Sequence, residues 1–311
     1  MTVRLVSYNV RYFGHGLKGL ASTAAAKTRI AQALTSLEEL PELIALQEVE
    51  TKSFRAGIAT RGAPANENQL DAFLRHFSAA LKHRGVKMPY QAWYFPAHVY
   101  RLGRIRLYTT GLAMLVNTER LAVIGDNQES PHSITHHRST RLKKVKQTRI
   151  AAHLALETGD SRRFHVFNTH LSLPTPWAKE FWAQKKKMGH GANQLAEARA
   201  VAGYASQIAG PEPYLVVGDF NSAPATPVYE YMTGEAKLHG AQEQLKQIEP
   251  RSTDSFSTAG FMALRMHLDH IFGSKHIAFL DLDDTYLFGD ERSPFTGLSD
   301  HVPLITRFEV E

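Results

Sequence analysis

The chain has 311 residues and no cysteine, which excludes disulfides, thiolate metal sites and a cysteine nucleophile. Its hydrophobic content of 43% and charged content of 21% are ordinary for a globular protein and exclude disordered and fibrous architectures. The 36 basic and 30 acidic side chains give a net charge of +6, which favours anionic partners such as nucleic acid, phospholipid or a phosphorylated small molecule.

The hydrophobic pattern predicts a succession of strands and helices. The first elements are a strand over Val3–Asn9 and a helix over Ala24–Leu37, for which Ser22 or Thr23 is the expected N-cap. Further strands are expected over Leu43–Gln47, Tyr90–Phe95, Leu112–Val116, Arg149–Leu156, Arg163–Thr169, Tyr214–Val217, Leu268–Phe272 and Val302–Phe308. Further helices are expected over Asn68–Lys82 and Ala192–Ile208.

No internal repeat or low-complexity linker divides the chain, so we expect one domain over residues 1–311, built from two packed sheets flanked by helices. No apolar run approaches the roughly 20 residues that span a bilayer. The N-terminus runs directly into a strand pattern without a signal peptide. We therefore expect a cytoplasmic protein, with secretion as the alternative if a signal peptide has been removed.

Chemically versatile polar residues stand where the predicted strands begin or end. Strand ends and adjoining loops are where a scaffold presents catalytic groups. We expect these residues to converge on one pocket: Asn9, Glu48, His170, Asp219 with Asn221, Asp269, and Asp300 with His301.

The segment Val216–Ser222 is the most informative of these, because an apolar strand delivers Asp219 and Asn221 through Gly218. The carboxylate could bind a metal or orient water, and the amide could donate to a phosphate oxygen. The structural alternative is an Asx turn that ends a strand.

Two acidic residues are expected beside His301. Asp300 precedes it directly, which suits an acid–base histidine next to a metal-binding carboxylate. Asp269, at the head of a buried strand, would fix the tautomer of His301 and raise its pKa if the two were hydrogen-bonded. The alternative partners of Asp269 are Arg265 and His267.

Three other strand-end residues are weaker candidates in isolation. Glu48 ends a buried run, where a carboxylate needs a partner, a metal or solvent. His170 could assist a leaving group or neutralise a phosphate oxygen if protonated, and Asn9 could orient a ligand. A solvated acid, a structural histidine and a turn asparagine are the respective alternatives.

Together these segments resemble the endonuclease/exonuclease/phosphatase superfamily, which has the DNase I-like fold. Six short motifs occur in the order of that superfamily between residues 7 and 301: Ser-Tyr-Asn-Val, Leu-Gln-Glu-Val, Asn-Thr-His-Leu, Gly-Asp-Phe-Asn, Leu-Asp-His-Ile and Ser-Asp-His. The resemblance implies an α+β fold: a four-layer α/β/β/α sandwich of two mostly antiparallel sheets flanked by helices.

The resemblance also implies a metal centre. Glu48 corresponds to the principal metal ligand, with Asn9 and Asp300 close to the metal or its waters. Mg²⁺ is the expected ion, with Mn²⁺ or Ca²⁺ as alternatives, because a hard carboxylate suits such cations. Some nucleases of the superfamily carry an acid where this chain has Arg11, so a second metal there is in doubt.

The catalytic roles that the resemblance implies fall on five residues. Asp219 would orient or activate the attacking water, and Asn221 would hold a phosphate oxygen. His301, supported by Asp269, would act on the phosphate and in proton transfer. His170 corresponds to the second catalytic histidine of the DNase I-like and sphingomyelinase-like branches, although the sequence offers no secure carboxylate partner for it.

Two basic segments are candidates for substrate binding. The run His132–Arg149 has no acid and includes Arg141, Lys143 and Lys144, which could track a phosphate backbone. Arg101 and Arg104 alternate with tyrosines, which suits base stacking or a membrane interface. A solvated loop and a strand with a solvated basic face are the alternatives.

The aromatic segment that contains Trp177, Phe181 and Trp182 could be a nucleic-acid clamp, a lipid-facing lid or a packed helix.

The expected function is a divalent-metal-dependent phosphoesterase, first of all a nuclease or nucleic-acid phosphodiesterase. The alternative is a phosphatase or sphingomyelinase-like phosphodiesterase acting on inositol phosphates or membrane lipid. A non-catalytic binding module is a third hypothesis, and no obligate protein partner is inferred.

Overall fold

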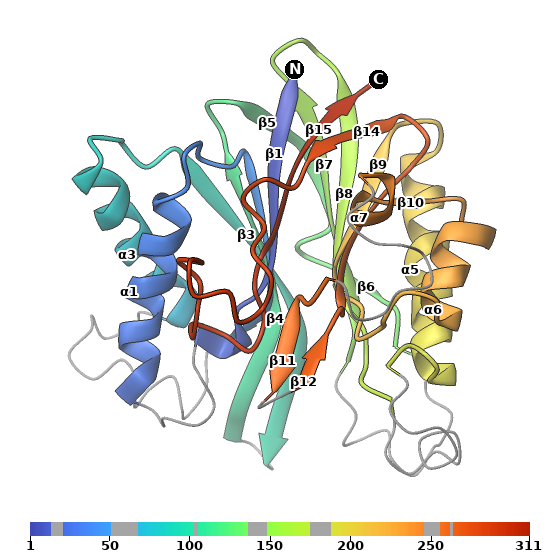
Figure 1. Cartoon of the computed structure of the whole chain (residues 1–311), viewed down its shortest axis with the longest axis horizontal. Coiled ribbons are helices and arrows are strands. Elements are labelled where there is room, and N and C mark those ends of the chain that lie inside the picture. Colours follow the sequence, from blue (N-terminus) through green and yellow to red (C-terminus); the bar gives the residue numbers. More distant parts are fainter. Residues whose placement is uncertain are drawn as a thin grey trace.

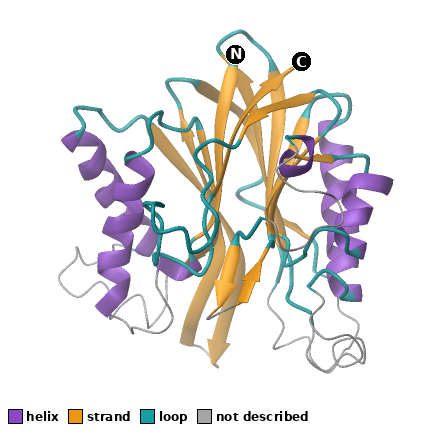
Figure 2. Cartoon of the chain, in the orientation of Figure 1, coloured by secondary structure: helices purple, strands orange, loops and turns teal. Residues whose placement is uncertain are grey.

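The computed structural model describes residues 1–13, 21–50, 68–102, 105–135, 148–174, 188–245, 256–261 and 264–311. Two β-sheets pack face to face, and helices cover the outer face of each, so the fold is the expected four-layer α/β/β/α sandwich (Figures 1 and 2). Both chain termini lie at one end of the sandwich (Figure 1).

The first sheet has six strands in the order β14-β15-β1-β2-β4-β3. Among the described residues, β1 and β2 form its parallel pair, and its other pairs are antiparallel. The strands are β1 (Thr2–Asn9), β2 (Leu43–Glu50), β3 (Tyr90–Leu102), β4 (Ile105–Asn117), β14 (Ile277–Asp281) and β15 (Leu304–Val310).

The second sheet follows the order β10-β13-β9-β8-β7-β5, with β6 paired to β7. Here β8 and β9 are parallel and the other pairs are antiparallel. The strands are β5 (Leu121–Asp126), β6 (His132–Ser133), β7 (Ile150–Thr158), β8 (Arg163–His170), β9 (Tyr214–Asp219), β10 (His239–Gly240) and β13 (Asp269–Gly273). A separate hairpin joins β11 (Ala259–Phe261) to β12 (Leu264–Met266).

Helices cover the two outer faces. The first sheet carries α1 (Ala21–Thr35) and α3 (Gln69–His83), and the second carries α5 (Ala192–Ala209) and α6 (Pro227–Glu230) (Figure 2). Shorter turns are η1 (Arg11–Phe13), η3 (Tyr231–Glu235) and α7 (Ala241–Gln244). Every helix in the described residues is too short or too polar to traverse a bilayer.

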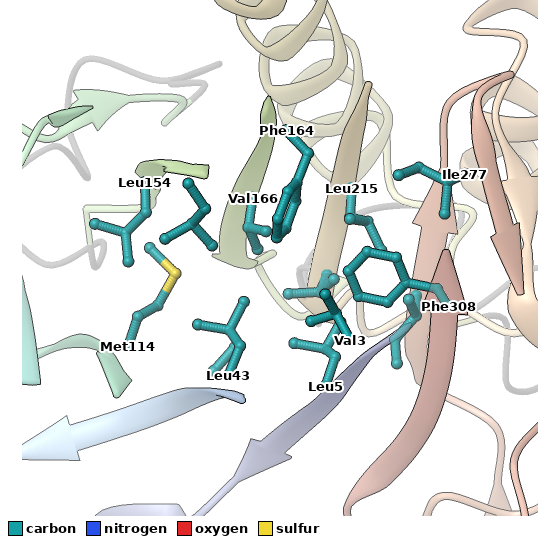
Figure 3. Close-up of a cluster of buried hydrophobic side chains, with 14 of the residues drawn as sticks. Val3, Leu5, Leu43, Met114, Leu154, Phe164, Val166, Leu215, Ile277 and Phe308 are labelled. Carbon is teal, nitrogen blue, oxygen red and sulfur yellow. The ribbon is translucent and has the colours of Figure 1, made fainter. Parts of the chain in front are cut away.

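Three apolar clusters hold the layers together. The central cluster lies between the sheets, where side chains such as Val3, Leu43, Met114, Val166 and Leu215 meet (Figure 3). The second packs α1 and α3 on the first sheet, and the third packs α5 and α6 on the second. Because β2 and β9 are apolar on both faces, they read in the sequence as continuous hydrophobic runs.

Several predicted boundaries differ from the structure. Helix α1 begins at Ala21, so Ser22 and Thr23 lie inside it and the predicted N-cap is wrong. Strand β3 continues to Leu102, well beyond its predicted end at Phe95. Strand β4 begins at Ile105, well before its predicted start at Leu112. These outer arms pair with each other, from His98 with Thr110 to Leu102 with Ile105.

Candidate active site

The strand ends that carry polar residues meet at the end of the sandwich opposite the termini. In Figure 1, β1 runs away from the N-terminus, so Asn9 lies at the far end of the first sheet. In the second sheet the register aligns three candidates side by side, because Asp219 is the Cα partner of both His170 and Asp269. The topology therefore explains why residues distant in the sequence share one site.

His301 is tied to Asp269. The ring Nδ1 of His301 lies 2.8 Å from Asp269 Oδ2, and both side chains are buried. The opposite nitrogen, Nε2, lies 3.7 Å from Asp219 Oδ2. The predicted His301–Asp269 hydrogen bond is thus present, and it makes Nδ1 the donor to a carboxylate.

The electrostatics of this pair favour a protonated imidazole. Burial alone lowers the pKa of His301, but the charges of Asp269 and Asp219 outweigh it and raise the pKa to about 10. The other oxygen of Asp269, Oδ1, is buried and has no hydrogen-bond partner. The Asp269 carboxylate is therefore paired with His301.

Asp219 is the centre of the hydrogen-bond network. Its Oδ2 accepts from Asn9 Nδ2 at 2.9 Å and lies 3.4 Å from His170 Nε2, while its Oδ1 accepts from the Asn221 amide at 2.9 Å. Burial raises the pKa of Asp219 to about 7, against the opposing effect of the His301 charge. A carboxylate with a pKa near neutrality is suited to accept a proton at physiological pH.

The turn after β9 is held in a left-handed conformation. Asn221 has φ 48°, and Gly218 has φ 138°, where a side chain would run into the carbonyl oxygen of Thr169. The side-chain amide of Asn221 donates to Leu171 O at 2.9 Å and lies 3.2 Å from His170 Nε2. The Asx turn that was the alternative reading is present, and it also places the amide against His170.

Glu48 enters the site from the first sheet at an irregularity in β2. Its φ is 54°, and the register of β2 on β4 shifts between Leu46 and Val49. A left-handed conformation costs a non-glycine residue roughly 1–2 kcal/mol, and such strain tends to occur at functional positions. The carboxylate lies 3.5 Å from Asn9 Nδ2 and 3.9 Å from His170 Nε2. Burial raises the pKa of Glu48.

His170 lies between the carboxylates of Glu48 and Asp219 but is not held protonated by them. Burial lowers the pKa of His170 well below its usual value, and the charges of Arg149 and His301 lower it further. The sequence left the protonation of His170 open, and in the free site its burial favours the neutral imidazole.

Asp300 forms an ion pair with Arg11. Arg11 Nη1 lies 2.5 Å from Asp300 Oδ2, and Ser299 Oγ lies 3.3 Å from Asp300 Oδ1. Arg11, Tyr12 and Phe13 all have positive φ, and the Arg11 amide donates to Asn9 Oδ1 at 3.0 Å. Asn9 consequently directs its nitrogen, and not its oxygen, toward the carboxylates.

A small hollow, open to solvent, lies beside these groups. The residues that line it include Tyr12, Glu48, Thr110, Arg149 and His170. Among the described residues, buried Arg149 Nε has no hydrogen-bond partner, which places a cationic donor close to the site.

The structure leaves most of the predicted substrate-binding residues untested. Arg104, Arg141, Lys143 and Lys144 lie outside the described residues, as do Trp177, Phe181 and Trp182, and only the backbone of Arg101 is described. Arg149 is the last residue of the predicted basic run and the first of a predicted strand, and its place beside His170 comes from the register of β7 on β8. The sequence shows Arg11 at a position where some nucleases of the superfamily carry an acid, but it does not show the ion pair of Arg11 with Asp300.

The donor set fits one hydrated divalent cation at Glu48. Within the described part of the chain, no lysine or arginine comes within 4.0 Å of the Glu48 carboxylate, which is partly exposed and lines the hollow. Mg²⁺ typically takes one or two protein carboxylates and keeps several waters. Asp219, Asp269 and His301 also bring potential ligand atoms within 4.8 Å of one another. In this group, however, His301 Nδ1 and the Asp269 carboxylate are already hydrogen-bonded to each other.

A four-layer sandwich with carboxylates and imidazoles at one end of both sheets defines the DNase I-like class of phosphoesterases. A profile of the Endonuclease/Exonuclease/phosphatase family matches residues 6–301, so the chain belongs to this family of phosphoric-ester hydrolases. A search of curated protein sequences gave no match.

Solved structures of the same fold are similar over the whole chain. The human Nocturnin catalytic domain with bound sulfate is 20% identical, with a TM-score of 0.65 and coverage of 100% of this chain and 95% of that one. ANGEL2, a 2′,3′-cyclic phosphatase, is 15% identical, with a TM-score of 0.63 and coverage of 99% and 95%. Mannosyl-6-phosphatase Bt3783 of Bacteroides thetaiotaomicron is 17% identical, with a TM-score of 0.57 and coverage of 99% of each chain. At these identities the likeness establishes the fold and not the substrate.

Proposed function

We propose that this protein is a Mg²⁺-dependent phosphodiesterase, most suited to nucleic acid, that hydrolyses its substrate by in-line attack of water. The observation that carries the proposal is the convergence of Glu48, His170, Asp219 and His301, whose side chains approach one another within 4 Å in a chain of contacts across both sheets. A binding module would not need this set of acid–base groups.

The proposed metal ligand is Glu48, with Asn9 and Asp300 beside it. The ion would neutralise charge on a non-bridging phosphate oxygen and on the leaving oxygen. Asn9 donates to Asp219 and faces Glu48, so its proposed part is to hold both carboxylates. Asp300 is neutralised by Arg11, which supports a single ion over a pair.

The proposed proton acceptor is Asp219, whose raised pKa of about 7 suits removal of a proton from water. His301, kept protonated by Asp269, would stabilise the negative charge that grows on the phosphoryl oxygens. Asn221 would donate to another of these oxygens, and its amide already points toward His170. His170, neutral in the free site, would donate once an anionic phosphate raises its pKa.

Two features support a nucleic-acid substrate. The net charge is +6, and Arg149, whose Nε has no hydrogen-bond partner in the described part of the chain, lines the hollow beside Glu48. The fold is also shared with a mannosyl-6-phosphatase and a 2′,3′-cyclic phosphatase, so a small phosphate ester is the second candidate.

The test is hydrolysis of a substrate panel with Mg²⁺, with Mn²⁺ and with chelator. The panel comprises plasmid, single-stranded DNA, RNA, sphingomyelin and inositol phosphates. The catalytic variants are His301→Ala and Asp219→Asn, and their matched controls are the exposed His276→Ala and Asp283→Asn.

We expect metal-dependent cleavage of nucleic acid, lost in the two catalytic variants and kept in the two controls. Affinity for nucleic acid should fall steeply with added salt, because each phosphate contact releases counterions. Activity restricted to inositol phosphates or sphingomyelin would establish the second candidate. Inactivity on every substrate would contradict the enzymatic proposal.

A further inference from the structure

Helix α5 carries two buried polar side chains on the face that packs against the second sheet. Gln194 and Glu197 are three residues apart, so they share one face of the helix, and each is 0% exposed. They lie among apolar residues such as Ala198 and Val201. Buried polar groups are costly unless they are hydrogen-bonded, so their partners indicate what they do.

Gln194 holds the turn that carries Asn221. Its Nε2 donates to Asn221 O at 2.7 Å, and its Oε1 accepts from the amides of Gly189 at 3.2 Å and Gly191 at 3.1 Å. The next carbonyl, that of Ser222, lies 2.6 Å from His270 Nε2. The left-handed conformation of Asn221 is thus fixed by groups outside the turn.

Glu197 holds the segment that follows His170. Its two oxygens accept from the amide and the hydroxyl of Ser172, each at 2.8 Å. Between the two held segments, Asn221 Nδ2 donates to Leu171 O at 2.9 Å and Leu171 N donates to Asp219 O at 2.9 Å. One face of α5 therefore fixes both segments from which His170 and Asn221 project.

We propose that Gln194 and Glu197 are positioning residues that hold His170 and Asn221 against each other in the reacting geometry. They act through Asn221 and Ser172 and not by contact with the metal ligand Glu48, which lies on the other sheet. The catalytic consequence rests on the proposed function, whereas the structural consequence does not.

The kinetic test uses bis(p-nitrophenyl) phosphate with Mg²⁺ as the substrate. Gln194→Ala and Glu197→Ala should lower kcat by about 10²-fold, because a small misplacement of reacting groups is costly, while KM changes little. Glu197→Gln should recover most of the activity, since its amide can accept from the Ser172 amide and donate to the hydroxyl. The exposed Gln207→Ala on the same helix should behave as the wild type.

The spectroscopic test follows the ring signals of isotope-labelled histidine by NMR, with His170 identified from the His170→Gln variant. Both alanine variants should shift or broaden the His170 signals and leave those of His301 in place. Should Gln194→Ala not fold, Gln194→Glu keeps the acceptor for Gly189 and Gly191 but loses the donor to Asn221. Should Glu197→Ala not fold, the replacement variant is Ser172→Ala, which removes the hydrogen bond from the Ser172 hydroxyl to Glu197 and keeps the one from the Ser172 amide.

Unchanged His170 signals in the folded variants, with kcat within about twofold of the wild type, would overturn the inference. If the wild type hydrolyses neither this ester nor any substrate of the panel, the proposed function fails, and the NMR comparison still decides whether α5 positions His170.

Discussion

The imidazole of His301 lies between two carboxylates, with Nδ1 2.8 Å from Asp269 Oδ2 and Nε2 3.7 Å from Asp219 Oδ2. Asp269 thereby fixes the ring and supports its charge, while Asp219, the proposed proton acceptor, lies beside Nε2. The proposed base and the proposed acid are thus two buried neighbours whose pKa values are both raised, that of Asp219 to about 7 and that of His301 to about 10.

The first prediction concerns the pH dependence of the reaction. The pKa of Asp219, raised to about 7 by burial, and that of His301, raised to about 10 by its carboxylate neighbours, predict a bell-shaped profile for kcat/KM. Asp269→Asn removes a charge that raises the pKa of His301, so the alkaline limb should move to lower pH. A pH–rate profile and an NMR titration of His301 check this, and an unmoved alkaline limb would contradict the assignment.

The ion pair between Arg11 and Asp300 yields a second prediction. Both side chains are partly exposed, 33% and 25%, so Arg11→Ala should cost less than about 1 kcal/mol of unfolding free energy. The change also removes a positive charge beside the proposed cation site, so Mg²⁺ or Mn²⁺ should bind more tightly. Isothermal titration of the metal measures the affinity, with Arg11→Lys as the charge-conserving control. Weaker binding in the alanine variant would show that Arg11 supports the metal site.

Buried neutral histidines predict acid sensitivity. Burial lowers the pKa of His153 and of His270 to about 4, against about 6.5 in an unfolded chain. Between these values the unfolded chain binds more protons, so the stability that these residues contribute is present above about pH 6.5 and is lost as the pH falls toward 4. Because one pKa unit corresponds to about 1.4 kcal/mol, the loss of unfolding free energy is up to about 3 kcal/mol for each histidine.

Urea unfolding at pH 7 and pH 5 measures this dependence. His153 Nε2 is 2.8 Å from His165 Nδ1 and its ring stacks on Phe167, so His153→Phe keeps the stacking but removes the titrating group. The variant should lose less stability than the wild type between the two pH values. An equal loss in both proteins would show that His153 does not contribute to the acid sensitivity.

The sequence predicted the central part of each sheet and the candidate residues at the strand ends. Apolar runs such as Tyr214–Val217 mark buried strands, and the pairing of those strands brings Asp219 beside His170 and Asp269. The order of the six motifs also indicated the correct fold, because they occupy the ends of strands that this topology places at one edge.

Other features depend on three-dimensional context that no local pattern carries. The left-handed conformation of Glu48 arises from a register shift against β4, and the environment of Arg149 comes from the hollow between the sheets. Gln194 and Glu197 look in the sequence like ordinary polar positions of a helix. Both side chains are buried and hydrogen-bonded because loops pack against α5, and the sequence does not reveal that packing.

The most direct measurement of the central claim is the rate of phosphodiester hydrolysis against Mg²⁺ concentration for the wild type and Glu48→Gln. The substitution removes the carboxylate charge with little change of shape, and the exposed Glu311→Gln is its control. We predict a saturable Mg²⁺ dependence for the wild type and the control, abolished by chelator and absent from Glu48→Gln. Hydrolysis that persists with chelator, or that Glu48→Gln performs as well as the wild type, would contradict a metal centre at Glu48.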